Sequence, residues 1–194
     1  PLIPRGAGTN LSGGVIPTID GGEVVLDLAG FTGPVDIDRT NMVAVARPGV
    51  ITGEVHAAAE AVDLFYPPDP SSCKRCTIGG NVAENAGGPR CLKYGVTGHY
   101  VLGLEVVLAN GKTARLGGRT VKNVTGYQMH QLFVGSEGTL GVITEATLRL
   151  IPRPRQRRTA LAAFSDLDDA GGAVTALLHA GVVPCAVELM DRFC

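Results

Sequence analysis

The sequence lacks tryptophan altogether, has only 5% aromatic residues, and carries a formal net charge of −1. A nucleic-acid-binding protein would show a surplus of basic residues, so the balanced charge argues against that class. No apolar run approaches the roughly 18 residues of a membrane span, and the first residues lack the pattern of a secretory signal. With 194 residues and 45% hydrophobic side chains, the chain is predicted to be globular with a substantial core.

Disulfide and metal patterns are weak as well. The five cysteines stand at positions 73, 76, 91, 185 and 194. An odd number in a chain of this size does not indicate a disulfide framework, so we predict reduced thiols in a reducing compartment. A zinc site built on Cys73 and Cys76 would need a second pair or a histidine, and the candidates Cys91 and His99 stand at no standard spacing. The sequence therefore predicts no metal site.

Glycine is the residue in excess, because the 27 glycines are about twice the usual share. Eleven of them lie in three clusters of small residues, at 6–14, 67–88 and 135–144. Each cluster alone is compatible with a turn-rich connection, but together they indicate an elongated polar ligand that lies against backbone at several points. Neither common nucleotide motif is present. Leu11 stands where a Rossmann fingerprint needs its third glycine, and Val106 stands where a P-loop needs its first.

Strand and helix patterns surround these clusters. We predict strands over residues 1–4, 23–28, 42–46, 100–108, 113–116 and 140–150. Asn110 and Gly111 predict a hairpin turn between residues 108 and 113. A helix is predicted over residues 50–62, where apolar residues recur on one face, and three prolines make residues 64–72 an extended loop.

The last part of the chain has a pattern of its own. Five arginines at positions 149, 153, 155, 157 and 158 are interpreted as a solvated connection. Strands are predicted over 160–164 and 182–189, with a helix between them that Asp166 caps and Gly181 closes. This strand–helix–strand pattern suggests the opening of a second domain.

Six motifs, taken together, resemble one family. They are PRGAGT at 4–9, PDPSS at 68–72, TIGGN at 77–81, NAGG at 85–88, KYG at 93–95 and GSEGTLG at 135–141. The arrangement resembles the FAD-binding domain of the vanillyl-alcohol oxidase type, also called PCMH-type. Within it, the most similar branch contains D-lactate dehydrogenase, D-2-hydroxyglutarate dehydrogenase and the D subunit of glycolate oxidase. The resemblance implies an α+β fold. Residues 1–152 would form the FAD-binding domain with two α/β subdomains, and residues 153–194 a linker and the start of an α+β substrate (cap) domain.

The resemblance also implies where FAD lies. The first cluster would hold the pyrophosphate through backbone amides, the second would line the diphosphate and flavin side, and the third would follow the adenosine half. The implied FAD-binding residues are Arg5, Gly6, Ala7, Gly8, Thr9, Asn10, Gly13, Gly14, Pro68, Asp69, Pro70, Ser71, Ser72, Thr77, Gly79, Gly80, Asn81, Ala86, Gly87, Gly88, Tyr94, Gly95, Glu137, Gly138, Gly141, Val142 and Ile143. Covalent attachment in this superfamily often uses a histidine of the first loop. Thr9 and Asn10 stand there instead, so noncovalent FAD is expected.

The implied activity is oxidation of a small 2-hydroxy acid, such as glycolate or D-lactate, to the 2-oxo acid with hydride transfer to FAD. His99 is a candidate base. The simpler interpretation is an imidazole in a loop ahead of a strand, so no catalytic residue is assigned. Two alternatives stay open. One is a noncatalytic FAD-binding or assembly subunit of a multi-subunit dehydrogenase. The other is a reductase of a nucleotide-sugar enolpyruvyl ether, which the PDPSS and TIGGN motifs disfavour.

The resemblance finally sets expectations about the rest of the molecule. Members of this branch have a further segment before the first loop and a large C-terminal substrate domain with a histidine-containing metal site. The chain is therefore expected to be truncated at both ends, inactive alone, and apolar at its exposed end. Expected partners are the substrate, an electron-acceptor protein or quinone, and a second copy or the subunits of a glycolate-oxidase-like complex. The expected location is the cytoplasm, at the inner membrane through such subunits.

Overall fold

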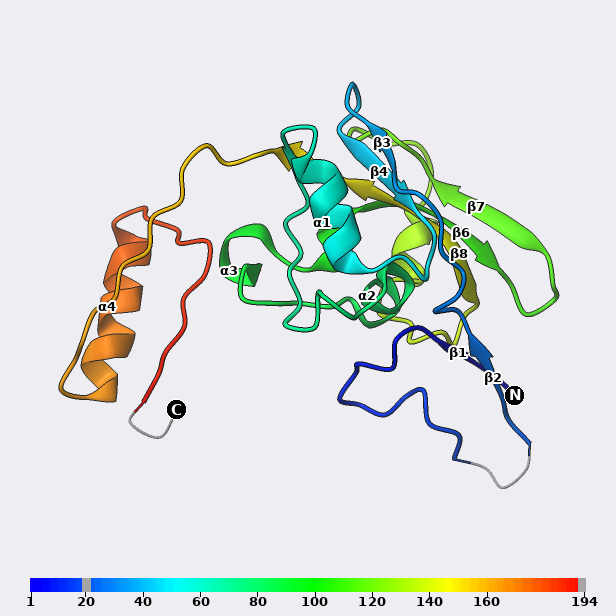
Figure 1. Ribbon diagram of the computed structural model, residues 1–194, viewed down its shortest axis with the longest axis horizontal. Coiled ribbons are helices and arrows are strands. Elements are labelled where there is room, and N and C mark those ends of the chain that lie inside the picture. Colours follow the sequence, from blue (N-terminus) through cyan, green and yellow to red (C-terminus); the bar gives the residue numbers. More distant parts are fainter. Residues whose placement is uncertain (19–21, 192–194) are drawn as a thin grey trace.

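The protein is built around one antiparallel sheet of five strands. The computed structural model describes residues 1–18 and 22–191. The strand order is β3 (Asp36–Asp38), β4 (Val43–Ala46), β8 (Val142–Arg149), β6 (Val101–Val107) and β7 (Thr113–Gly117). Every neighbouring pair is antiparallel, and the pairing of β4 with β8 joins distant parts of the chain (Figure 1). The α+β class predicted from the sequence is confirmed.

The hairpin between β6 and β7 forms where the sequence predicts it. Val107 pairs with Thr113 across the turn, and Gly111 takes a positive φ of 76° that favours glycine. Asn110 supports the turn, since its Oδ1 accepts a hydrogen bond from the Lys112 amide at 3.0 Å. Strands β4, β6 and β8 also lie where their apolar patterns predict them. The sequence of β3 does not predict a strand. This segment forms an edge strand because its backbone pairs with β4.

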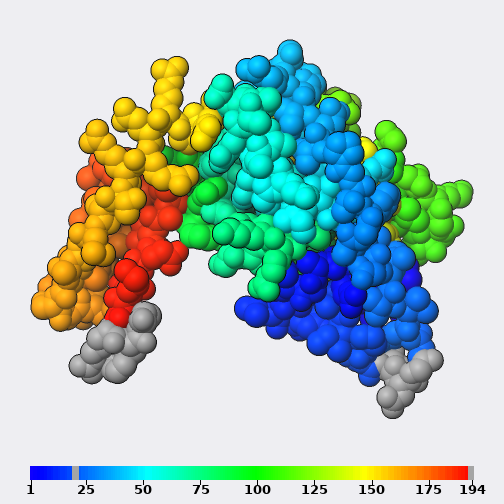
Figure 2. All heavy atoms as spheres, viewed as in Figure 1, coloured from blue at the N-terminus to red at the C-terminus, as the bar shows by residue number. Residues whose placement is uncertain are grey.

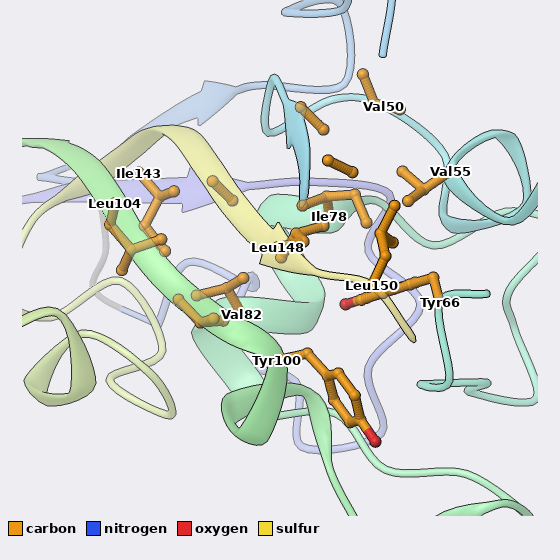
Figure 3. Packing of buried hydrophobic residues seen from close by; sticks show 14 of the residues in the cluster. Val50, Val55, Tyr66, Ile78, Val82, Tyr100, Leu104, Ile143, Leu148 and Leu150 are labelled. Carbon is orange, nitrogen blue, oxygen red and sulfur yellow. The ribbon is translucent and has the colours of Figure 1, made fainter. Parts of the chain in front are cut away.

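Two helices pack on the sheet and enclose the core. Helix α1 (Thr52–Glu60) contacts β4, and helix α2 (Ile78–Glu84) contacts β8. Figure 3 shows Ile78 and Val82 of α2 beside Leu148 of β8, and all three side chains are fully buried. The sequence predicts helix α1 with boundaries two residues too wide at each end.

Helix α2 is not predicted by the sequence, because it lies in the small-residue cluster 67–88, which is also compatible with a turn-rich connection. Ile78 and Val82 are four residues apart, so they form one apolar row, and this row holds the helix on β8. Glycine and asparagine have low helix propensity, so tertiary packing rather than local preference stabilises the helix. It ends at Asn85, whose left-handed backbone, with a φ of 50°, is a usual C-terminal cap.

Short elements complete the body. Strands β1 (Leu2–Arg5) and β2 (Val24–Asp27) form a parallel pair that delivers the first glycine cluster to the edge of α2. Strand β5 (Leu64–Phe65) pairs with β9 (Ile151–Pro152), so the first two residues of the predicted loop are a strand. Helix α3 (Cys91–Tyr94) is a single turn.

The segment after β9 stands beside the body rather than within it (Figures 1 and 2). Helix α4 (Leu167–His179) is confirmed with its cap, because Asp166 Oδ1 accepts a hydrogen bond from the Asp169 amide at 2.8 Å. The strands predicted over 160–164 and 182–189 are wrong, since both stretches are irregular and mostly exposed. A strand needs a partner for its backbone groups, and none lies beside these stretches in the described chain.

The arginine-rich connection is solvated, as expected. Arg149 is half-buried at the end of β8, and the other four arginines are exposed. Arg153 lies 3.5 Å from the Glu60 carboxylate, which ties the start of the connection to α1. Among the described residues, no helix combines the length and apolar character needed to cross a bilayer.

Core packing predicts a large difference between two leucine substitutions. Leu148→Ala removes a side chain that is 0% exposed and should lower the free energy of unfolding by about 2–5 kcal/mol. Leu161→Ala removes a side chain that is 87% exposed and should change it by no more than about 0.5 kcal/mol. Urea unfolding followed by circular dichroism measures both. Equal losses would contradict the placement of the core.

Candidate functional site

A cleft opens between the loop after β1, helix α2 and the segment before β8, where parts of all three glycine clusters meet. The predicted residues that line it are Gly6, Ala7, Gly8, Thr9, Asn10, Gly14, Pro70, Ser72, Thr77, Gly79, Gly80, Asn81, Ala86, Glu137, Gly138, Gly141 and Ile143. The first cluster precedes all five strands of the sheet in the sequence, and the third runs into strand β8. The fold therefore brings together the segments for which the sequence predicts one shared ligand.

Other predicted residues lie outside the lining. They are Arg5, Gly13, Pro68, Asp69, Ser71, Gly87, Gly88, Tyr94, Gly95 and Val142. Some serve the protein itself: Arg5 pairs with Asp27 at 2.6 Å, and Asp69 pairs with Arg90 at 3.0 Å. A Cβ on Gly88 would collide with the Asp69 carbonyl, so this glycine allows two backbone segments to touch. For these residues a role toward FAD stays a prediction.

The lining also contains residues that are not in the implied FAD-binding set: Pro4, Val15, Leu28, Pro48, Cys76, Ala83 and Glu84. Of these, only Pro4 belongs to one of the six motifs. Ala83 and Glu84 lie one helical turn after Gly79 and Gly80, so a helix places both pairs on one side. That relation is invisible in a stretch for which the sequence predicts no helix. Pro48 has no sequence signal, and it reaches the cleft because its carbonyl accepts a hydrogen bond from the Gly79 amide at 2.8 Å.

The loop after β1 exposes a run of backbone donors. Within the described residues, the amides from Gly6 to Asn10 donate no hydrogen bond to another protein group. Gly8 has a φ of 63°, and Asn10 Oδ1 accepts from the Gly13 amide at 2.9 Å, which closes the loop. Consecutive free amides in a turn form a concavity for anions. The loop therefore suits a phosphate group.

Glycines around the cleft serve close packing as well as ligand approach. A Cβ on Gly79 would lie 2.6 Å from the Pro48 Cβ, and one on Gly138 would lie 2.9 Å from the Pro4 Cγ. A side chain at either position would push two chain segments apart. Gly8 differs, because the one atom near its Cβ position is Arg5 Cδ, at 4.0 Å. Gly8 is thus the glycine that most clearly leaves its space to a ligand.

Thr77 supplies a polar atom that the protein leaves without a partner. Its side chain is 1% exposed, and its hydroxyl Oγ1 has no hydrogen bond in the described structure. The Cβ positions of Gly6 and Gly80 both point at this oxygen, so glycine at each position keeps the space around it open. A buried hydroxyl without a partner costs about 1–3 kcal/mol, and a ligand oxygen in the cleft would remove that cost. The cleft therefore fits a ligand with phosphate and hydroxyl oxygens.

Two carboxylates stand at the rim of the cleft. Glu84 and Glu137 both belong to the lining, and the Cβ position of Gly14 is 3.0 Å from Glu137 Oε2. Desolvation raises the pKa of Glu84, the Glu137 carboxylate raises it further, and a hydrogen bond with Asn10 opposes both. Carboxylates only accept hydrogen bonds, so they suit the hydroxyl or amino groups of a ligand.

A buried network fixes the start of α2 from behind. Asn81 Nδ2 donates to Thr52 Oγ1 at 2.6 Å, and Thr52 Oγ1 donates to the Cys76 carbonyl at 3.2 Å. Asn81 and Thr52 are 3% and 0% exposed. The network joins α1, α2 and the residue before Thr77, so it positions the unpartnered hydroxyl.

His99 lies away from the cleft. It is exposed in the single turn before β6 and lines a separate cavity of about 450 Å³ with His130 and Arg149. Burial lowers the pKa of His130 in that cavity. The two hollows share no lining residue, so the fold does not bring His99 into the cleft.

The raised pKa of Glu84 predicts a pH-dependent effect of Glu84→Gln. The folded state holds the Glu84 proton more tightly than the unfolded state, so the cost of the carboxylate is present above the folded pKa and disappears as the pH falls through it. Glu84→Gln should raise the melting temperature at neutral pH, and the difference should shrink on acidification. Glu188→Gln, at an exposed carboxylate after α4, is the control and should shift nothing. A shift that grows toward acidic pH would contradict the sign.

Comparisons with known proteins match this architecture. The family model described as FAD binding domain matches residues 1–117, and the model described as FAD linked oxidases, C-terminal domain, matches residues 153–194. The glycolate oxidase subunit GlcD of Bacillus subtilis is 50% identical over 99% of this chain. A D-lactate dehydrogenase of Archaeoglobus fulgidus is 42% identical over 99% of it. The chain spans 40% and 42% of the lengths of these relatives.

A solved structure of alkyldihydroxyacetonephosphate synthase has a TM-score of 0.79 and 25% identity, and the match covers 95% of this chain and 33% of that one. Its name differs from those of the relatives, so the shared fold does not by itself set the reaction. The first family model covers more than half of the chain and includes two of the three segments that wall the cleft. The chain belongs to the FAD binding domain family.

Proposed function

We propose that the cleft binds FAD noncovalently and that the chain is the cofactor-binding part of an enzyme that oxidises a small 2-hydroxy acid to the 2-oxo acid. The observation that carries the proposal is the run of free amides from Gly6 to Asn10 beside the buried, unpartnered hydroxyl of Thr77. A glycolate oxidase subunit and a D-lactate dehydrogenase among the relatives support the substrate class.

Different cleft residues would bind different groups of FAD, according to whether they donate or accept hydrogen bonds. The amides of the first loop and the Thr77 hydroxyl are donors, so they would take oxygens of the pyrophosphate. Glu84 and Glu137 would repel that anion, so we assign them hydroxyl or amino hydrogens elsewhere on the cofactor. The Pro48 and Pro4 contacts hold Gly79 and Gly138 in place, which keeps the cleft shaped before a ligand arrives.

Bound FAD supplies the acceptor for the hydride equivalent that leaves the hydroxyl-bearing carbon. The chain must then bind the substrate carboxylate and hold the proton of the hydroxyl. The part of the cleft that the structure describes is lined by no arginine, lysine or histidine. We therefore assign both tasks to groups outside the cleft and name no catalytic residue within it.

A noncatalytic FAD-binding or assembly subunit is the second candidate. It is favoured by the same lack of cationic lining and by the word subunit in the name of the B. subtilis relative. In both cases we expect an electron-acceptor protein or quinone, a second copy or further subunits, and a cytoplasmic location at the inner membrane. We also keep the division into residues 1–152 and 153–194, which the start of the second family match at residue 153 supports.

Thr77→Val tests the proposed contact with FAD. Without FAD, the variant should be as stable as the parent or more stable, because it removes a buried hydroxyl that has no partner. With FAD, the dissociation constant should rise about threefold to tenfold, which corresponds to one lost hydrogen bond. Fluorescence titration with FAD and thermal unfolding measure the two effects.

Thr97→Val is the matched control. Thr97 is also fully buried, but its Oγ1 donates to the Ala86 carbonyl at 2.8 Å. This variant should lose about 0.5–1.5 kcal/mol of unfolding free energy. Unchanged FAD affinity in Thr77→Val, or a stability loss equal to that of Thr97→Val, would overturn the assignment of the hydroxyl.

The function is tested on protein from the complete reading frame. It should bind FAD with a flavin spectrum, release all of it on denaturation, and reduce a dye with glycolate, D-lactate or D-2-hydroxyglutarate. The 194-residue chain should bind FAD without turnover, because losing substrate orientation costs many powers of ten in rate. Flavin that stays attached would contradict noncovalent binding. Bound FAD with no turnover by the complete protein would favour the assembly subunit. Comparable turnover by the short chain would make His99 the first candidate base.

A further inference from the structure

Three side chains of different chemistry converge at the PDPSS segment. His56 comes from α1, and Asp69 and Cys73 come from the chain between β5 and α2. One ligand atom from each lies within 4.8 Å of the other two, and all three residues are half-buried. Imidazole nitrogen, carboxylate oxygen and thiolate sulfur are the ligand types that zinc takes in proteins. No residue of the group lines the cleft.

The imidazole of His56 is held by a backbone carbonyl. Its Nε2 lies 2.8 Å from the Pro68 carbonyl oxygen, and a carbonyl only accepts, so Nε2 carries the hydrogen. The tautomer therefore leaves the lone pair on Nδ1. Metal-binding histidines usually donate their other ring N–H to a backbone carbonyl or carboxylate in this way. A tilted contact with the buried Tyr66 ring, 5.8 Å between centroids, also limits the rotation of the imidazole.

Asp69 is held by a partner outside the group. Arg90 Nε donates to Asp69 Oδ2 at 3.0 Å, and both side chains are about one-fifth exposed. This pair engages Oδ2, and the Cys73 thiol also donates a hydrogen bond to the carboxylate, so a metal ion would take the place of that thiol proton. The guanidinium opposes a nearby cation, so the expected affinity is moderate. Outer partners of this kind hold ligating carboxylates in place in known metal sites.

We propose that His56, Asp69 and Cys73 form a binding site for a zinc-like divalent metal ion, with the fourth position open to water. Binding forms a bond from the metal to the sulfur of Cys73, whose thiol proton leaves to solvent. The metal would clamp α1 to the segment that carries Pro70 and Ser72, two residues of the cleft wall. The sequence does not predict this site, because His56 and Cys73 stand at no standard ligand spacing and only the fold brings them near each other.

Cobalt and zinc titrations of the purified protein test the site. With Co²⁺ we expect one equivalent to bind and to give a thiolate-to-cobalt charge-transfer band. Cys73→Ser should abolish the band, and His56→Gln should weaken Zn²⁺ binding at least tenfold by calorimetry. Zn²⁺ should raise the melting temperature of the parent protein and leave Cys73→Ser unchanged.

Cys185→Ser is the control, because Cys185 is another half-buried free thiol outside the group. This variant should keep both the band and the stabilisation. Asp69→Asn gives a second test in case Cys73→Ser does not fold, and circular dichroism reports the fold of each variant. A parent protein without the band, a band that survives Cys73→Ser, or a loss in Cys185→Ser would overturn the site.

Discussion

The contact between α2 and strand β8 determines the shape of the cleft. Ile78 and Val82 are fully buried against the sheet, so another side of the same short helix carries Gly79 and Gly80 to the cleft. The helix has little room to shift, because the Ile78 and Gly79 amides donate to the carbonyls of Val50 and Pro48 at 2.9 and 2.8 Å. A ligand therefore meets backbone that is already held in place, which lowers the ordering cost of binding.

Donors and acceptors meet in the same cleft. Free amides and the Thr77 hydroxyl present donors, and Glu84 and Glu137 present acceptors beside the same loop, since Glu84 hydrogen-bonds with Asn10 and Glu137 lies next to Gly14. A ligand that carries both phosphate and hydroxyl groups can satisfy both sets. The protein itself leaves the Thr77 oxygen unsatisfied, which is costly without a ligand.

The fold places the residues of the cofactor cleft, but it does not identify the residues that act on a substrate. Relatives with similar sequences are named for different hydroxy acids, and a structure with a TM-score of 0.79 is named for a synthase. A shared cleft is compatible with all of them, because the reaction depends on the groups of a site rather than on the fold. Behind the cleft wall, the group of His56, Asp69 and Cys73 adds a second chemistry that the cleft does not use.

Local patterns in the sequence were enough for strands β4, β6 and β8 and for the Asn110–Gly111 turn. Alternation and turn chemistry act between near neighbours, so the sequence by itself determines them. Tertiary structure decided that residues 78–84 are a helix, that Glu84 joins the lining, and that His56 approaches Cys73. Each of these depends on contacts between segments far apart in the chain. Burial of Ile78 and Val82 on β8 outweighs the poor helix propensity of glycine and asparagine, and no local pattern records that energy.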